Sequence, residues 1–140
     1  MTKKKIILYS SLALLIIAVI ALSFYGVANK YSAKHISTRY LDNLLRAKYE
    51  QCYDDLSSDV KENTKKEDFI ETQKKAYGEE GKSFSNLKII INGEGLAIFE
   101  YYEKPDNKRK VAGVYTTTNG SVFGFIKKHQ VTNAYLPTDE

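Results

Sequence analysis

Cysteine and histidine are scarce in this sequence, which has one cysteine and two histidines in 140 residues. A single cysteine cannot form a disulfide within the chain, so a folded domain must be stabilised by its hydrophobic core. His35, His129 and Cys52 match no metal-ligand spacing, and we expect no metal site. A glycine-rich phosphate loop is also missing, because residues 92–95 have the pattern of a hairpin turn without a following helix. We therefore expect no bound cofactor.

Charged residues are absent from a long N-terminal stretch. Residues 6–29 carry no charge, and Lys3, Lys4 and Lys5 precede them. The apolar run 6–27 would form a helix of about 33 Å, long enough to cross a bilayer. The lysines favour a cytoplasmic N-terminus. We predict a single-pass cell-membrane protein with its anchor in residues 1–30 and its main domain outside. The alternative is a signal peptide cleaved after Ala28, where small residues fit a cleavage site.

The formal net charge of +4 belongs to this N-terminal segment. Residues 1–30 contain four of the 21 basic residues and no acidic one, so the rest of the chain balances 17 basic against 17 acidic side chains. A nucleic-acid-binding domain concentrates positive charge in its folded part. We therefore expect no nucleic-acid partner.

Residues 29–56 contain neither glycine nor proline, which predicts one long helix. At helical spacing its apolar residues form one stripe: Leu41, Leu44, Leu45, Tyr49, Cys52 and Leu56. Cys52 lies in the middle of this stripe. A reactive thiol needs a nearby base and partial exposure, and His35 is almost five turns away. We interpret Cys52 as a small core residue that faces a sheet.

A short turn and a second helix follow. Thr64 and Glu67 have the spacing of a capping box, which predicts Thr64 as the N-cap. Gly78 is a natural end for this helix.

From Ser83 onward the hydrophobic period is that of strands, and three turn signals separate four of them. These signals are Asn-Gly at 92–93, Pro-Asp-Asn at 105–107 and Asn-Gly at 119–120. Residues 131–140 follow neither period, and we predict a loose tail there. The fold class is therefore α+β, with a long and a short helix packed on one face of a curved four-stranded antiparallel meander.

The helical segment resembles the opening of small bacterial domains of the nuclear-transport-factor-2-like (cystatin-like) superfamily. The matching residues are Tyr40, Leu41, Leu44, Tyr49, Cys52, Tyr53, Leu56, Ser57 and Phe69. The resemblance implies a domain at 31–130 in which helix and sheet enclose a cone-shaped pocket. Members of that superfamily include isomerases, dehydratases, small-ligand carriers and non-catalytic scaffolds. A single span before such a domain also resembles the bitopic scaffold subunits of secretion and conjugation machines.

No convergent pair of catalytic residues stands out, and we expect no enzymatic activity. Glu100 is flanked by aromatic residues on a strand, where a cross-strand ion pair with Lys110 is the simplest interpretation. Candidate pocket-lining or interaction residues are Tyr49, Cys52, Phe99, Glu100, Tyr101, Tyr115, Phe123 and Phe125. The expected function is that of a non-catalytic, membrane-anchored scaffold for protein partners in a cell-envelope assembly, a second copy of the chain among them. The alternative is a small-ligand-binding or isomerase-like domain.

Overall fold

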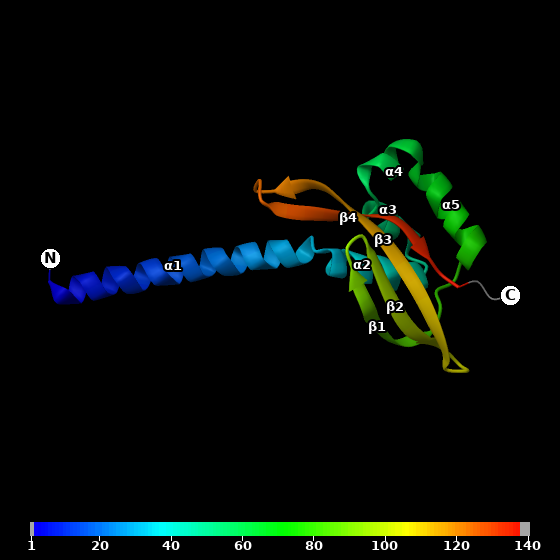
Figure 1. The fold of residues 1–140 in the computed structure, drawn as a ribbon, viewed down its shortest axis with the longest axis horizontal. Coiled ribbons are helices and arrows are strands. Elements are labelled where there is room, and N and C mark those ends of the chain that lie inside the picture. The colour runs from blue at the N-terminus through cyan, green and yellow to red at the C-terminus, as the bar shows by residue number, and fades with distance from the viewer. Residues whose placement is uncertain (1, 138–140) are drawn as a thin grey trace. The chain divides into compact units, whose positions relative to one another are not determined.

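The chain forms two units, one up to Lys30 and one from Tyr31 onward, and the computed structural model describes residues 2–137 (Figure 1). The first unit is the helix α1 (Lys3–Lys30), in which no residue is buried. Its 28 residues span about 42 Å. This helix is long and apolar enough to cross a membrane.

The segment 29–56, for which we predicted one long helix, contains two helices after α1, namely α2 (Ala33–Leu45) and α3 (Tyr49–Asp54). The break lies at Ala47, which has a positive φ of 57°. Lys48 N–H donates to the Asn43 carbonyl at 2.9 Å and Ala47 N–H to the Leu44 carbonyl at 3.2 Å, which is the bonding pattern of a Schellman motif. The prediction of one helix was wrong because alanine takes the place of the glycine that usually marks this motif.

Two further helices complete the helical layer, α4 (Ser58–Asn63) and α5 (Lys66–Tyr77). The segment that we expected to be a turn is therefore partly helical. The N-cap of α5 is Lys65 rather than Thr64, and it makes no side-chain capping bond. Thr64 instead ends α4, and its carbonyl accepts a hydrogen bond from the Tyr53 hydroxyl at 2.9 Å. Gly78 ends α5 as predicted, with a φ of 95°.

The sheet is an antiparallel meander in the order β1-β2-β3-β4. Its strands are β1 (Phe84–Gly93), β2 (Leu96–Glu103), β3 (Lys108–Val122) and β4 (Ile126–Tyr135). The first hairpin turns at Glu94 and Gly95, two residues beyond the predicted Asn-Gly pair, and Gly95 has a φ of 76°. The second hairpin turns at residues 104–107, as predicted.

The third turn is displaced from its predicted position. Asn119 and Gly120 lie inside β3 at a register irregularity between Thr118 and Ser121. The Asn119 amide donates to Ser58 Oγ at 3.1 Å and to Gln130 Oε1 at 3.2 Å, which holds this part of the strand in place. The chain reverses at residues 123–125 instead.

The prediction of a loose tail at residues 131–140 is also wrong for the first half of that segment. β4 continues to Tyr135, Val131 is fully buried, and Leu136 is buried beyond the strand. Val131 N–H donates to the Asp55 carbonyl at 2.9 Å, and its carbonyl accepts from Ser57 N–H at 2.7 Å. The segment after α3 thus forms a short parallel bridge with β4. Residues 138–140 of the predicted tail lie outside the described residues.

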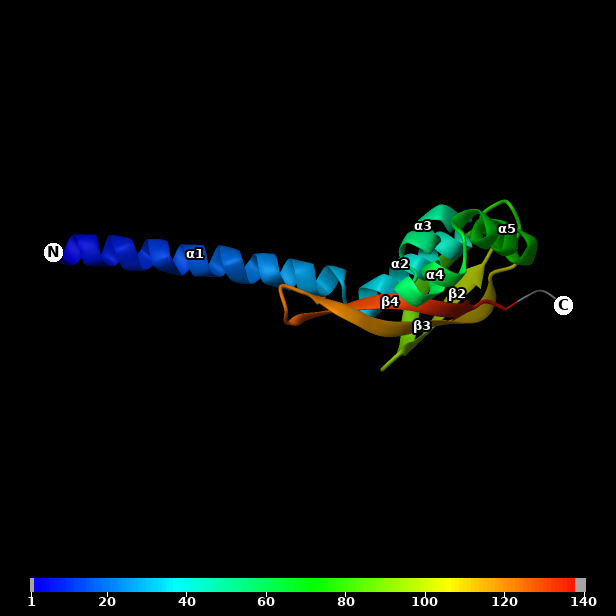
Figure 2. The same ribbon diagram turned by 90° about the horizontal axis from the view of Figure 1, so that it is seen from above.

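Within the second unit, α2 to α5 all lie on one face of the sheet (Figure 2). The α+β class is therefore confirmed, with four helices in this layer rather than two. The core fills the space between the layers. It includes Ile36, Tyr40, Leu41, Leu44 and Leu45 from α2, and Ala97, Phe99, Tyr101, Ala112, Val114 and Val131 from the sheet. Each fully buried large apolar side chain contributes about 1.5–3 kcal/mol.

Candidate functional site

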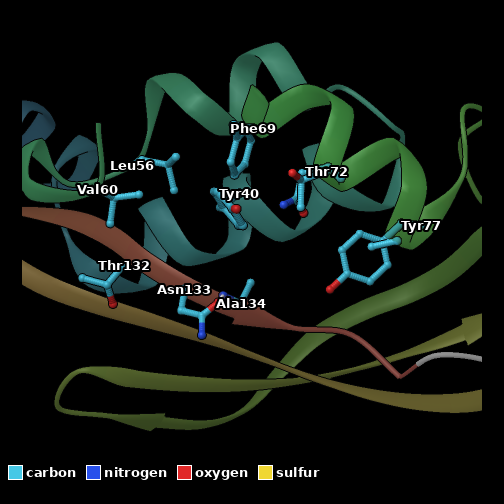
Figure 3. Close-up of a pocket in the computed structure, with 11 residues that line it drawn as sticks. Tyr40, Leu56, Val60, Phe69, Thr72, Tyr77, Thr132, Asn133 and Ala134 are labelled. Atoms are coloured by element: carbon cyan, nitrogen blue, oxygen red, sulfur yellow. Dashed lines mark hydrogen bonds between the residues drawn. The ribbon is translucent and has the colours of Figure 1, made fainter. Parts of the chain in front are cut away.

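A cavity of about 320 Å³ lies between the helices and β4 (Figure 3). Its lining comprises Tyr40, Leu56, Val60, Phe69, Thr72, Gln73, Ala76, Tyr77, Thr132, Asn133 and Ala134. The helix α5 supplies most of the helical side, α2 contributes Tyr40, and β4 supplies the opposite side. The volume is at the low end of the range for small-molecule sites, about 300–1,000 Å³.

Tyr40 is the most deeply buried polar side chain in this lining. It comes from α2, is 2% exposed, and lies beside Leu56 and Phe69 in Figure 3. Burial raises the pKa of Tyr40 well above its ordinary value, so the hydroxyl stays protonated at neutral pH and can donate a hydrogen bond.

The remaining polar groups of the cavity are neutral. Thr72 and Gln73 come from α5, and Thr132 and Asn133 from β4. Tyr77 is the second titratable residue of the lining, and burial raises its pKa as well. No lining residue is charged at neutral pH, so the cavity offers hydrogen bonds and apolar surface but no general base. This chemistry suits binding of an uncharged, partly apolar group.

The second candidate is the outer face of the sheet, opposite the helices. Side chains alternate along each strand, and the register places Ile91, Ile98, Val111, Tyr115 and Tyr135 on this face. Ile91 is 54% exposed, Tyr115 44% and Tyr135 62%. In the part of the second unit that the structure describes, no helix covers this face. Exposed apolar side chains grouped in this way are typical of interaction surfaces.

An ion cluster lies next to this apolar group. Glu100 accepts a hydrogen bond from Arg109 Nε at 2.8 Å, and Lys88 Nζ lies 3.0 Å from its other oxygen. The Arg109 guanidinium, and then the Lys88 ammonium, hold the pKa of Glu100 below its ordinary value. Glu100 therefore forms a cross-strand ion pair, but not with the predicted Lys110, which lies opposite Tyr101 in the register. We call Ile91, Ile98, Val111, Tyr115 and Tyr135, together with this cluster, the outer sheet surface.

The predicted site residues are divided between the core and the surface. Phe99, Tyr101 and Cys52 are fully buried core residues, and Cys52 Sγ lies 3.7 Å from the Tyr40 carbonyl oxygen. Tyr49 is also buried, and its hydroxyl donates to the Gly78 carbonyl at 2.6 Å. None of these four lines the cavity.

The other predicted residues lie at or near the surface. Glu100 and Tyr115 belong to the outer sheet surface. Phe123 and Phe125 lie in the β3–β4 turn rather than on the last strand. The polar side of the cavity was missed because Thr132 and Asn133 fall in the segment that we predicted to be a tail. The apolar residues Val131 and Leu136 on either side of this segment, both buried in the structure, were the available sequence signal for a strand.

The histidines lie apart from both candidate sites. His35 is exposed on α2, and His129 Nδ1 lies 3.1 Å from the Tyr31 carbonyl oxygen. Among residues 2–137, no three His, Cys, Asp or Glu side chains are grouped so that they could hold a metal ion.

No protein-family model, no curated protein and no solved structure matches this chain.

Proposed function

We propose that the chain is a single-pass membrane protein whose domain from Tyr31 onward lies outside the cytoplasm and binds a protein partner in a cell-envelope assembly. The outer sheet surface carries the proposal. Interfaces are enriched in tyrosine and combine an apolar centre with polar groups, and this surface presents Tyr115 and Tyr135 beside a neutralised carboxylate. The role is that of a non-catalytic scaffold or accessory.

The membrane part of the proposal depends on α1. Its uncharged stretch and the three lysines at its start favour insertion with the N-terminus in the cytoplasm. Anchoring confines the domain to a thin layer and raises its effective concentration for other proteins of the same membrane. Alkaline carbonate should leave the full-length protein in the membrane pellet. A soluble product shortened at its N-terminus would show that the segment is a signal peptide.

Photo-crosslinking in intact cells tests the partner. A benzophenone amino acid at Tyr115 should capture a defined protein. The same residue at Lys74, on the exposed face of α5, should not. Val111→Lys places a charge on the same sheet face and should abolish capture from position 115. Equal capture at both positions, or capture that survives Val111→Lys, would contradict a role for this surface.

The cavity supports a second candidate function, the binding of a small neutral molecule. The specific observation is the buried Tyr40 side chain, which lines the cavity and keeps its proton at neutral pH, so that its hydroxyl can donate a hydrogen bond to a ligand. A ligand oxygen that accepts this hydrogen bond would add stability. A ligand-binding role would also fit the resemblance to the nuclear-transport-factor-2-like superfamily.

Thermal shift measurements with neutral alcohols and amides of about six to ten carbons test this second candidate. Binding should raise the melting temperature of the full chain in detergent. Ala134→Leu fills the cavity from β4 and should remove the shift, whereas Lys74→Leu on the outside of α5 should not. A shift that persists in Ala134→Leu would show that these compounds bind elsewhere.

A further inference from the structure

The turn between β3 and β4 exposes two phenylalanines. Phe123 is 65% exposed and Phe125 is 66% exposed. Phe123 also has a positive φ of 55°, followed by Gly124 at 78°. Turns with this backbone strongly favour Asn-Gly or Gly-Gly, and a bulky residue with positive φ is an outlier. A phenylalanine in this position is therefore unfavourable for both conformation and solvation, which calls for a functional explanation.

The base of this hairpin is fixed to the chain where the domain begins. His129 N–H donates to the Tyr31 carbonyl at 3.2 Å, and Lys128 Nζ lies 5.6 Å from the centre of the Tyr31 ring. Tyr31 directly follows Lys30, the last residue of α1. Whatever the orientation of α1, chain connectivity therefore keeps His129 close to the point where α1 ends. From His129 to Ile126, where the turn begins, the strand covers about 10 Å, so the tip is within reach of the membrane surface.

The chemistry of the tip suits a lipid interface. Residues 116–131 contain Lys127 and Lys128 and no acidic residue. Phenylalanine side chains of interfacial segments insert at the boundary between headgroups and acyl chains, and lysines next to them are attracted to anionic lipids.

A partner strand is a less suitable occupant of this end of the sheet. β4 is an edge strand, but Tyr31, Asp55 and Ser57 already occupy its outward backbone groups at His129 and Val131. An added strand would have to replace these bonds.

We propose that Phe123 and Phe125 insert into the headgroup region of the bilayer that α1 crosses, with Lys127 and Lys128 against anionic headgroups. This inference rests on the proposed membrane span. Two attachments, the span and the hairpin tip, would fix how the domain is oriented on the membrane. That orientation in turn determines which partners can reach the outer sheet surface.

The chain contains no tryptophan, so one introduced tryptophan is an unambiguous reporter. Phe123→Trp in the full-length protein is reconstituted into phosphatidylcholine vesicles with a minor share of phosphatidylglycerol, with or without brominated acyl chains. We expect blue-shifted emission and about a twofold or greater loss of intensity with brominated lipid. Tyr135→Trp is the matched control, because Tyr135 is similarly exposed (62%) and lies at the other end of β4. Its emission should be unaffected by bromine.

Phe125→Trp is the second reporter in case the first variant does not fold. If neither tip variant shows a blue shift or bromine quenching beyond that of Tyr135→Trp, the proposal is wrong. A blue shift without bromine quenching would also overturn it, because the tip would then be buried against protein. Co-flotation with the vesicles separates this failure from failure of the membrane span. If the chain floats with the vesicles but the tip is not quenched, only the insertion of the tip is refuted. If the chain does not float, the membrane span and the insertion of the tip are both refuted.

Discussion

Cys52 should react with thiol reagents only when the domain unfolds. It is the only cysteine, so a colour reaction such as that of Ellman's reagent reports on it alone. Its side chain is fully buried in α3, and its Sγ lies 3.7 Å from the Tyr40 carbonyl oxygen. The reagent must reach a thiolate, and the native structure denies both access and ionisation.

The expected protection can be worked out from the pKa. Burial, and to a lesser extent the nearby Asp55 carboxylate, raises the pKa of Cys52 from 9.0 to about 12. Three pH units correspond to about a 1,000-fold smaller thiolate fraction at neutral pH, before any steric protection. In stopped-flow experiments the full-length protein in detergent should therefore react at least about 1,000-fold more slowly than in concentrated guanidinium chloride. A native rate within about tenfold of the denatured rate would refute this reasoning and revive a reactive thiol.

The same shift predicts a loss of stability in alkali. The unfolded thiol ionises above about pH 9, whereas the folded thiol keeps its proton until about pH 12. Between these values the unfolded state binds fewer protons, so the free energy of unfolding falls by up to about 1.4 kcal/mol per pH unit. Cys52→Ala should remove this part of the slope. It should leave the part due to Tyr40, whose pKa is also raised by burial. Identical slopes in the two proteins would contradict the assignment.

Three further predictions use urea unfolding of the full chain in detergent, followed by tyrosine fluorescence. Ala47→Gly should raise the free energy of unfolding by up to about 1 kcal/mol, because φ is 57° there; a lower value would refute strain at this helix end. Gly81→Ala should lower it by about 1–3 kcal/mol, since a Cβ would lie 2.8 Å from the Arg46 carbonyl oxygen, and an unchanged midpoint would mean that the loop moves. Glu100 has a lowered pKa, so folding stabilises its charged form and this stabilisation is lost as pH falls below 4.5. Glu100→Gln should reduce that acid loss, and an unaltered acid profile would contradict the Arg109 and Lys88 pairing.

Several features of the fold could be predicted from local sequence because one segment alone determines them. The uncharged N-terminal run predicts a helix of membrane-spanning length, and α1 has that length. Apolar spacing predicted that Cys52 is a core residue, and its side chain is fully buried. The Pro-Asp-Asn turn at residues 104–107 was correct because proline and asparagine constrain the backbone locally.

The candidate sites depended on contacts that the local sequence does not encode. Lys88 and Arg109 reach Glu100 only after β1, β2 and β3 pair in their actual register, in which Lys110 faces Tyr101. The cavity exists only where α2, α5 and β4 meet, and its Thr132 and Asn133 side was therefore not predicted.

Hydrophobic periodicity is a property of one segment, so local sequence was enough to predict that helices precede an antiparallel meander and that Cys52 is buried. The position of the break in the predicted long helix and the end of the last strand depend instead on tertiary contacts. Ala47 takes a glycine-like conformation because the packing of α2 and α3 outweighs its local preference. Residues 131–135 are a strand because β3 supplies hydrogen-bond partners on one side, and the backbone of Asp55 and Ser57 pairs with Val131 on the other. Those partners are distant in sequence, so a local sequence pattern cannot predict them.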